Sequence, residues 1–255
     1  MKNKLREKMA NRQKTVGAFS VFGSTAVMEC LGLAGLDFVI IDTEHGALDA
    51  ETAVPLILAA ERRGITPIVR VQDASRSSVL KMLDIGAMGL LVPFIKTVSE
   101  VENVIEYAKY MPLGQRGFGP GRQSGFGMLP GFGSIAEYFD TCNRETLVIP
   151  QCETPEAVDC IEDIAALDGV DGIFVGPYDL SIAMGKAMQF TDPEFTQAVQ
   201  RALSACKKAG KFCLTLAADP ATAKANFELG FDGVASADIS FLVSAAIGFV
   251  SGCRQ

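Results

Sequence analysis

The only imidazole in the chain, His45, lies at the end of an apolar run and three residues after a carboxylate, Asp42. Histidine titrates closer to neutral pH than the other side chains, which makes it the natural group for moving a proton. A lone histidine more often has a structural role, but a nearby carboxylate can fix its tautomer and favours catalysis. We therefore expect Asp42 and His45 to form a proton-transfer pair.

Two further carboxylates, Glu153 and Asp179, each follow an apolar run. A zinc site is not expected, because the chain has no second histidine and no Cys-x-x-Cys pair. Two carboxylates with water suit Mg²⁺ or Mn²⁺, which keep positions open for substrate oxygens. The alternative is that each carboxylate caps the helix that begins after it.

Arg70 is the only charged residue of the run TPIVR. Its guanidinium needs a partner, and a substrate carboxylate or an enolate oxygen would match its planar fork. The alternative is a structural ion pair with Asp42 or Asp84.

Other chemistries have weaker support. Alternation along a strand places Gln151 on the same side as Glu153 and turns Cys152 away, so Cys152 is expected to pack rather than react. A Schiff-base aldolase needs a desolvated lysine inside the fold, and the only candidate, Lys96, is expected to begin a helix. The chain also lacks the G-x-S-x-G elbow of serine hydrolases.

The elements that must position these residues alternate regularly along the chain. Short, nearly continuous apolar runs are typical of parallel strands buried on both faces, and helical patterns lie between them. Such βα units in 255 residues predict a (β/α)₈ TIM barrel, with residues 1–255 as a single domain. The rival, a doubly wound open sheet, lacks a G-x-G-x-x-G motif after the first strand. The expected strands are 16–22, 38–42, 66–70, 89–93, 147–151, 172–176, 212–216 and 232–236, and the expected helices are 49–63, 75–85, 97–109, 154–168, 193–209 and 219–229.

In a TIM barrel the reacting groups come from the C-terminal ends of the strands, and this is where the charged residues of the predicted strands gather. One long segment between the fourth and fifth strands, 114–133, contains eight glycines and is expected to be a surface loop. Its Arg116 and Arg122 could meet an anionic ligand, or they could be solvated side chains on a mobile loop.

Composition narrows the class of protein. With 49% hydrophobic residues the chain can bury a large core, and its net charge of −7 without a Lys/Arg-rich run argues against nucleic-acid and membrane partners. The charged start has no apolar signal region, and the longest uncharged run, 239–253, is too short to span a bilayer. Seven scattered cysteines indicate reduced thiols, so we expect a cytoplasmic protein.

Several segments resemble one family in both residue type and order. They are FVIIDTEHG, PIVRV, LDIGAMGLLVP, a G-x-RG-x-G loop, PQCET and GIFVGPYDLSIAMG, which are similar to the class II, metal-dependent pyruvate aldolases. These are the 4-hydroxy-2-oxoheptanedioate and 2-keto-3-deoxyglucarate aldolases, and the resemblance runs from about residue 15 to residue 235. It implies a carbon–carbon lyase that reversibly cleaves a 4-hydroxy-2-oxo acid to pyruvate and an aldehyde through a metal-bound pyruvate enolate.

The resemblance also implies a role for each matching position. Glu153 and Asp179 would hold the divalent metal, either Mg²⁺ or Mn²⁺, with Co²⁺ also acceptable. The substrate-binding positions would be Arg70, Gln151, Gly176, Pro177, Tyr178, Asp179 and Leu216.

The catalytic positions implied by the resemblance are Arg70, which would stabilise the enolate, and the pair Asp42 and His45, which would transfer the proton. Asp84 would support the site from across a subunit boundary. The family further implies a homohexamer with exchanged C-terminal helices, so that 239–253 would be an interface helix.

The chain departs from the family pattern at 110–113, 120–133 and 216–219, which are the segments expected to touch the aldehyde. The acceptor is therefore not implied. Two alternatives stay open: an acyl-CoA or citrate-type lyase or synthase on the same barrel, and a non-catalytic oligomeric binding protein. The first would need cations for the CoA phosphates, and the second would not need five charged rim residues.

Overall fold

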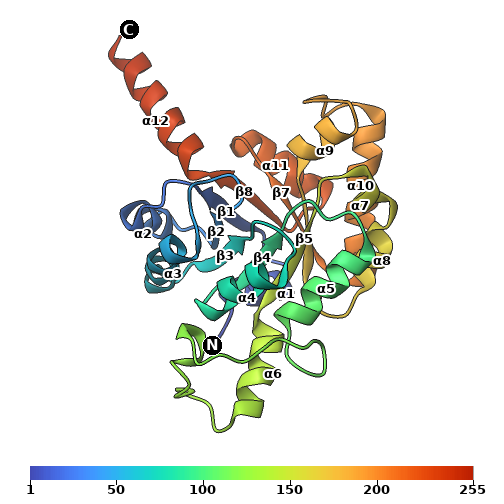
Figure 1. The fold of residues 1–255 in the computed structure, drawn as a ribbon. Helices are drawn as coiled ribbons and strands as arrows, with labels where there is room; N and C mark the ends of the chain where they lie inside the picture. The colour runs from blue at the N-terminus through green and yellow to red at the C-terminus, as the bar shows by residue number, and fades with distance from the viewer. Residues whose placement is uncertain (255) are drawn as a thin grey trace.

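The computed structural model describes residues 1–254, and its centre is a closed barrel of eight parallel strands in chain order (Figure 1). The first strand closes the barrel on the last, with Ala18 opposite Ser236. Each strand coincides within a few residues with one of the expected apolar runs, so the (β/α)₈ prediction is confirmed. The strands are β1 Thr15–Ser20, β2 Phe38–Asp42, β3 Thr66–Arg70, β4 Gly89–Val92, β5 Leu147–Cys152, β6 Gly172–Val175, β7 Phe212–Leu216 and β8 Gly233–Ala237.

Side chains alternate across each strand, which explains why the runs are apolar throughout. Phe38 and Ile40 of β2 point into the barrel, where they belong to the same packed cluster as Phe174. Val39 and Ile41 point outward and pack beneath the helices. Because both faces of the strands are covered, charged groups are left to the strand ends.

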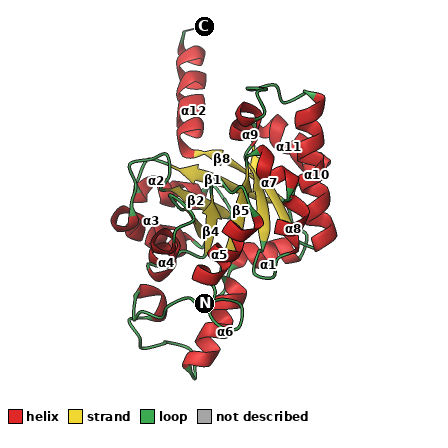
Figure 2. Ribbon diagram, turned by 45° about the vertical axis from the view of Figure 1, so that its right-hand side comes forward, coloured by secondary structure: helices red, strands yellow, loops and turns green. Residues whose placement is uncertain are grey.

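The helices form a layer around the barrel (Figure 2). Their ends follow local capping chemistry, as in the helix after β2, where Asp49 forms a capping box with Thr52 and Gly64 ends the helix at a φ of 74°. The helices are α1 Lys4–Ala10, α2 Thr25–Leu33, α3 Ala50–Arg63, α4 Arg76–Asp84, α5 Val98–Ala108, the 3₁₀ turn η1 Arg122–Ser124, α6 Ile135–Glu145, α7 Pro155–Asp159, α8 Ile161–Ala166, α9 Pro177–Ala183, α10 Pro193–Ala209, α11 Pro220–Leu229 and α12 Asp238–Cys253.

One expected helix, 154–168, is divided in two. Cys160 leaves the helical conformation, with φ −118° and ψ 21°, and separates α7 from α8. Its thiol donates to the carbonyl oxygen of Glu156 at 3.3 Å. The break allows each short helix to bury its own apolar side chains, Val158 in α7 and Ile164 in α8.

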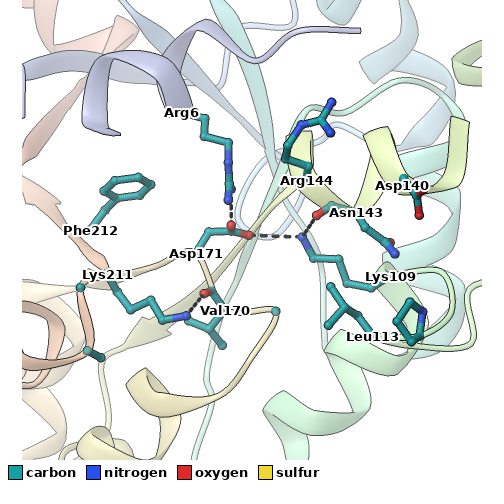
Figure 3. A pocket seen from close by; sticks show the side chains of 14 residues that line it. Arg6, Lys109, Leu113, Asp140, Asn143, Arg144, Val170, Asp171, Lys211 and Phe212 are labelled. Atoms are coloured by element: carbon teal, nitrogen blue, oxygen red, sulfur yellow. Dashed lines mark hydrogen bonds and ion pairs between the residues drawn. The ribbon is translucent and has the colours of Figure 1, made fainter. Parts of the chain in front are cut away.

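The N-terminal end of the barrel is closed by α1 and by charged residues beneath it. Leu5 of α1 is fully buried in the barrel's interior cluster. Asp171, just before β6, accepts from Arg6 and from Lys109, whose buried ammonium also donates to the carbonyl oxygen of Asn143 (Figure 3). Burial lowers the pKa of Lys109, and the charge of Asp171 opposes that shift. These contacts fasten α1, α5 and α6 to the strand ends and have a structural role.

The glycine-rich segment 114–133 lies at this same end, because it follows α5 rather than a strand. Arg116 is buried and donates to Asp84, the last residue of α4, at 2.8 Å. Arg122 pairs with Glu61, near the end of α3. Both arginines therefore pair with carboxylates of their own chain, and Arg116 is buried, so the alternative of a solvated side chain is wrong for this residue. The segment does not cover the C-terminal mouth of its own barrel.

Helix α12 projects away from the barrel at the opposite end (Figures 1 and 2). Every residue of it beyond Asp238 is exposed, including Phe241, Ile247 and Phe249. A helix that is apolar around its whole circumference is normally buried, so this one requires a cover. Within residues 1–254, none of the helices has the length and apolar character needed to cross a membrane.

Candidate active site

A cavity of about 320 Å³ opens at the C-terminal mouth of the barrel. Its walls come from the ends of β1, β2, β3, β7 and β8 and from the start of α9, which is where TIM barrels place their chemistry. The predicted site residues that line it are Asp42, His45, Arg70, Tyr178, Asp179 and Leu216.

Arg70 and Asp42 form a buried, two-pronged ion pair in this cavity. Arg70 donates through Nε to Oδ1 of Asp42 at 2.9 Å and through Nη2 to Oδ2 at 2.6 Å. The guanidinium also lies 4.8 Å from the ring centroid of Phe19. The ion pair with Asp42, which the sequence left as the alternative for Arg70, is thus present, and it leaves the N–H groups of Nη1 and the second N–H of Nη2 for other partners.

The electrostatics of this pair favour its charged form. Burial acts to raise the pKa of Asp42, but the hydrogen bond and charge of Arg70 outweigh it, and the net pKa is lowered. Burial likewise acts to lower the pKa of Arg70, and Asp42 and Glu44 reverse that effect. Arg70 is therefore a fixed positive charge at the mouth of the barrel.

The His45 ring is not held by Asp42 in this structure. Oδ1 of Asp42 instead accepts from the backbone nitrogens of Glu44 at 3.1 Å and His45 at 3.4 Å, so it shapes the loop. The Nε2 atom of His45 lies 3.8 Å from Oε2 of Glu44, and the ring is 65% exposed. Asp42 and His45 thus lie at one site, as their spacing suggested, but the carboxylate next to the imidazole is that of Glu44.

Glu44 is the site residue that the sequence arguments missed. Its Oε2 is buried, lies 3.2 Å from Nη1 of Arg70 and makes no hydrogen bond within the described chain. Burial raises its pKa, and the neighbouring charges of Asp42 and Asp179 add to that shift against Arg70 and His45. The available signal was the unbroken run Asp-Thr-Glu-His, in which Glu44 shares the loop of two candidate residues.

Glu153 lies just beyond β5 and is 4% exposed. Its Oε1 accepts from the backbone nitrogen of Phe94 at 2.7 Å, and its Oε2 accepts from the amide of Gln151. Burial raises the pKa of Glu153 to about 7, and the charges of Asp179 and Glu44 contribute. Burial makes the ionised form of this carboxyl group unfavourable, and a nearby positive charge would stabilise that form.

The backbone around Glu153 is adapted to that carboxylate. Phe94 has a φ of 54°, a left-handed conformation that is strained for a bulky residue and directs its N–H at Oε1. At Gly176 a Cβ atom would lie 2.8 Å from Oε2 of Glu153 and 3.0 Å from Nε2 of Gln151. A side chain at position 176 would therefore displace the carboxylate.

The capping alternative fails for Glu153, because Thr154 caps α7 through the backbone nitrogen of Ala157. Asp179 is not an N-cap either. It is exposed in the first turn of α9, whose N-cap position is Gly176. Both carboxylates are thus free of the structural role that was considered for them.

The surroundings of these carboxylates fit a hard divalent cation. They follow neighbouring strands, β5 and β6, and the pKa of Glu153 is raised mainly by burial, to which the charge of Asp179 adds. Oε1 of Gln151 is buried there without a hydrogen-bond partner in the described chain. Among residues 1–254 no three or more His, Cys, Asp or Glu side chains form a metal-binding group, so one chain would offer two carboxylates and leave the other positions to water and substrate.

A family model for HpcH/HpaI aldolase/citrate lyase matches residues 15–239. The chain belongs to this family. It is 35% identical to the 5-keto-4-deoxy-D-glucarate aldolase of Salmonella arizonae, over 91% of this chain and 89% of the relative. An HpcH/HpaI family protein from Burkholderia cenocepacia has the same fold, with a TM-score of 0.92 and 31% identity over 99% of this chain and all of the other. The citrate synthase SbnG is also similar, with a TM-score of 0.89 and 29% identity over 100% of this chain and 98% of the other.

Membership of the HpcH/HpaI family confirms that the chain is a carbon–carbon lyase of the aldolase type, and it argues against a non-catalytic binding protein.

The lysine considered for a Schiff base lacks the buried environment that this chemistry needs. Lys96 is 40% exposed, with Nζ 3.7 Å from Glu156, so it is not the desolvated amine that a Schiff base needs.

Asp84, by contrast, lies far from the mouth of its own barrel. It ends α4 at the N-terminal end and is held by Arg116. Within this HpcH/HpaI chain the residue therefore cannot reach the cavity that contains Arg70. Any contribution of Asp84 to a catalytic site must be made in another copy of the chain.

Proposed function

We propose that the protein is a divalent-metal-dependent aldolase that reversibly cleaves a 4-hydroxy-2-oxo acid to pyruvate and an aldehyde. The observation that carries the proposal is the placement of two carboxylates after neighbouring strands: Glu153 is buried just beyond β5, and Asp179, after β6, lines the cavity that also contains Arg70 and His45. Mg²⁺ or Mn²⁺ matches two carboxylates with open positions, and Co²⁺ is a further candidate. A bound dication would supply Lewis-acid stabilisation of the oxygen charge that develops on the pyruvate half.

Arg70 supplies a second positive charge for that oxygen. Asp42 takes N–H groups of Nε and Nη2 and so fixes the plane of the guanidinium. Nη1 lies 3.2 Å from Glu44, and the N–H groups of Nη1 and Nη2 that Asp42 does not take would be left for substrate. A preorganised donor of this kind costs no reorganisation when the enolate forms. Asp42 therefore acts on catalysis by positioning Arg70.

His45 is the proposed proton acceptor. In the cleavage direction the C4 hydroxyl loses its proton as the C3–C4 bond breaks, the bond's electrons enter the pyruvate enolate, and the aldehyde leaves. The enolate then takes a proton at C3 to give pyruvate. His45 lines the cavity from its rim, and Glu44, 3.8 Å away, stabilises the imidazolium that forms. Gln151, Gly176, Pro177, Tyr178 and Leu216 complete the proposed substrate-binding set.

The active assembly is proposed to be a homohexamer with exchanged C-terminal helices. The exposed apolar surface of α12 supports a partner at this helix, since a second copy of the chain could cover it. The same assembly would allow Asp84 to act in a neighbouring site. The seven free cysteines support a cytoplasmic location.

A citrate-type synthase remains the second candidate, because the chain is similar to SbnG. The two functions differ in the electrophile, which is an aldehyde in one case and a keto acid in the other.

The test is pyruvate release from a simple substrate such as 4-hydroxy-2-oxopentanoate, after treatment with EDTA and after re-addition of Mg²⁺ or Mn²⁺. We expect chelation to abolish release and either ion to restore it. Undiminished turnover in EDTA would remove the metal from the proposal. Condensation of a keto acid in preference to every aldehyde would favour the citrate-type reaction.

A further inference from the structure

A second cavity of about 320 Å³ lies beside the catalytic one, between α10 and α11. Its floor is formed by Val175 of β6 and Thr215 of β7. Phe195 and Val199 line it from α10, and Leu229 lines it from α11. We refer to it as the side cavity.

The side cavity is mainly apolar. Tyr178, Phe190 and Phe195 form a row of aromatic rings along it, with centroids 5.5 Å and 5.6 Å apart. Within the described chain no charged side chain lines it. Two of its polar side chains are turned to backbone carbonyls, Thr215 to Val175 at 3.0 Å and Asn226 to Leu216 at 3.0 Å.

The side cavity adjoins the catalytic cavity. Tyr178, Leu216 and Ala218 line both of them. Tyr178 precedes the proposed metal ligand Asp179, and Leu216 ends β7 at the barrel mouth. A substituent on the aldehyde carbon, which the enolate attacks in condensation and which departs in cleavage, would therefore meet this apolar space next.

We propose that the side cavity receives the apolar arm of the aldehyde, so that the acceptor is an aldehyde with an aliphatic or aromatic chain. The inference rests on the proposed aldolase function and names its substrate class. A sugar-acid aldehyde would carry a carboxylate, and burying this charge against walls that hold no charged side chain, where Thr215 and Asn226 already donate to backbone carbonyls, is unfavourable. The side cavity therefore favours a less polar acceptor than the sugar acid for which the Salmonella relative is named would supply.

The test compares condensation of pyruvate with n-alkanals of increasing length and with glyceraldehyde, in the presence of Mn²⁺. Each methylene that enters the side cavity is expected to raise kcat/KM by about fourfold until the space is filled. Val199→Trp fills the cavity from α10 and is expected to remove this gain, and Thr196→Phe, at an exposed position of the same wall, provides a second variant. Leu58→Trp, at an exposed position of α3 across the barrel, is the matched control.

Exchange of the methyl protons of pyruvate needs only the pyruvate half of the site. It therefore distinguishes a failure of the side-cavity proposal from a failure of the aldolase function. Two results would overturn the side cavity as an acceptor site while leaving the aldolase function intact. One is proton exchange with no rise in kcat/KM as the alkanal chain lengthens, and the other is a rise that persists in both cavity-filling variants. Absence of exchange with every metal would overturn the function and the acceptor role together. A gain that only the cavity-filling variants remove would establish the proposal.

Discussion

Asp42 holds Arg70 by two hydrogen bonds, of 2.9 Å and 2.6 Å, in the wall of the catalytic cavity. The residues end neighbouring strands that pair in register, Asp42 opposite Arg70. Their side chains meet because adjacent parallel strands point paired residues to the same face. The guanidinium is thereby oriented before any substrate arrives.

This relationship predicts what happens when Arg70 is replaced. Arg70→Ala should reduce exchange of pyruvate methyl protons by about 10²–10³, the typical cost of losing one oxyanion donor. Arg70→Lys should recover little, because an ammonium cannot hold both oxygens of Asp42 and also reach substrate. Lys96→Ala, outside the cavity, is the control. Wild-type exchange in Arg70→Ala would show that the arginine is only structural.

Stability should depend on pH through Glu153 when no metal is bound. Burial raises its pKa from 4.5 to about 7, so the folded state binds more protons than the unfolded state between these values. The free energy of unfolding therefore falls as pH rises through this window, by about 3 kcal/mol in total from this group. Urea unfolding in EDTA at pH 5 and pH 8 measures the change.

Two variants isolate that effect. Glu153→Gln should abolish the pH-dependent loss and unfold at higher urea than the wild type at pH 8, because the amide has no charge to bury. Glu156→Gln, at an exposed position of α7, should leave the wild-type pH dependence intact. If the free energy of unfolding of Glu153→Gln depended on pH as it does in the wild type, the Glu153 carboxyl would have the same pKa in the folded and unfolded chain.

His45 offers a chemical-rescue experiment, because its side chain is 65% exposed and its removal leaves a space open to solvent. His45→Ala should lower the rate of cleavage by about 10²–10⁴, the usual contribution of a general base. Added imidazole should restore part of the lost rate. The same imidazole should not restore Arg70→Ala, and a rescue of both variants would argue against a specific proton-transfer role for His45.

Helix α12 should control assembly. The double substitution of Ile247 and Phe249 by Ser removes two exposed apolar side chains from it and should lower the particle mass measured by sedimentation velocity. Leu33→Ser, which changes an exposed leucine on α2, should leave the mass unchanged. An unaltered mass in the α12 variant would place the oligomer contacts elsewhere.

Mixed oligomers test whether Asp84 acts across a subunit boundary. Asp84→Asn and Glu153→Gln subunits should each be nearly inactive alone. Denatured together and reassembled in equal amounts, they should regain activity in about a quarter of the sites, those that combine both native residues. Failure of the mixture to exceed its components would keep Asp84 in a structural role with Arg116.

Much of the fold could be predicted because the relevant signals are local. Strands such as 38–42 are marked by their own apolar residues, and Asp49 and Gly64 terminate α3 through hydrogen bonds within a few residues. The C-terminal end of each strand is also defined by chain order. Asp42, Arg70 and Asp179 could therefore be assigned to one rim before any coordinates were known.

The tertiary structure decided which of those rim residues touch. The spacing of Asp42 and His45 suggested a contact, yet the carboxylate is taken by Arg70 and the imidazole lies beside Glu44. Partners of this kind depend on strand register and side-chain direction, which sequence spacing does not contain. The same is true of Asp84 and the glycine-rich segment: chain order assigns both to the N-terminal end of the barrel, but the pairing of Arg116 with Asp84 appears only in the folded chain. Local sequence signals thus determined the helices and strands and the residues at the C-terminal ends of the strands. The charge pairing, the burial of Glu153 and the side cavity arise only when distant segments of the chain pack together.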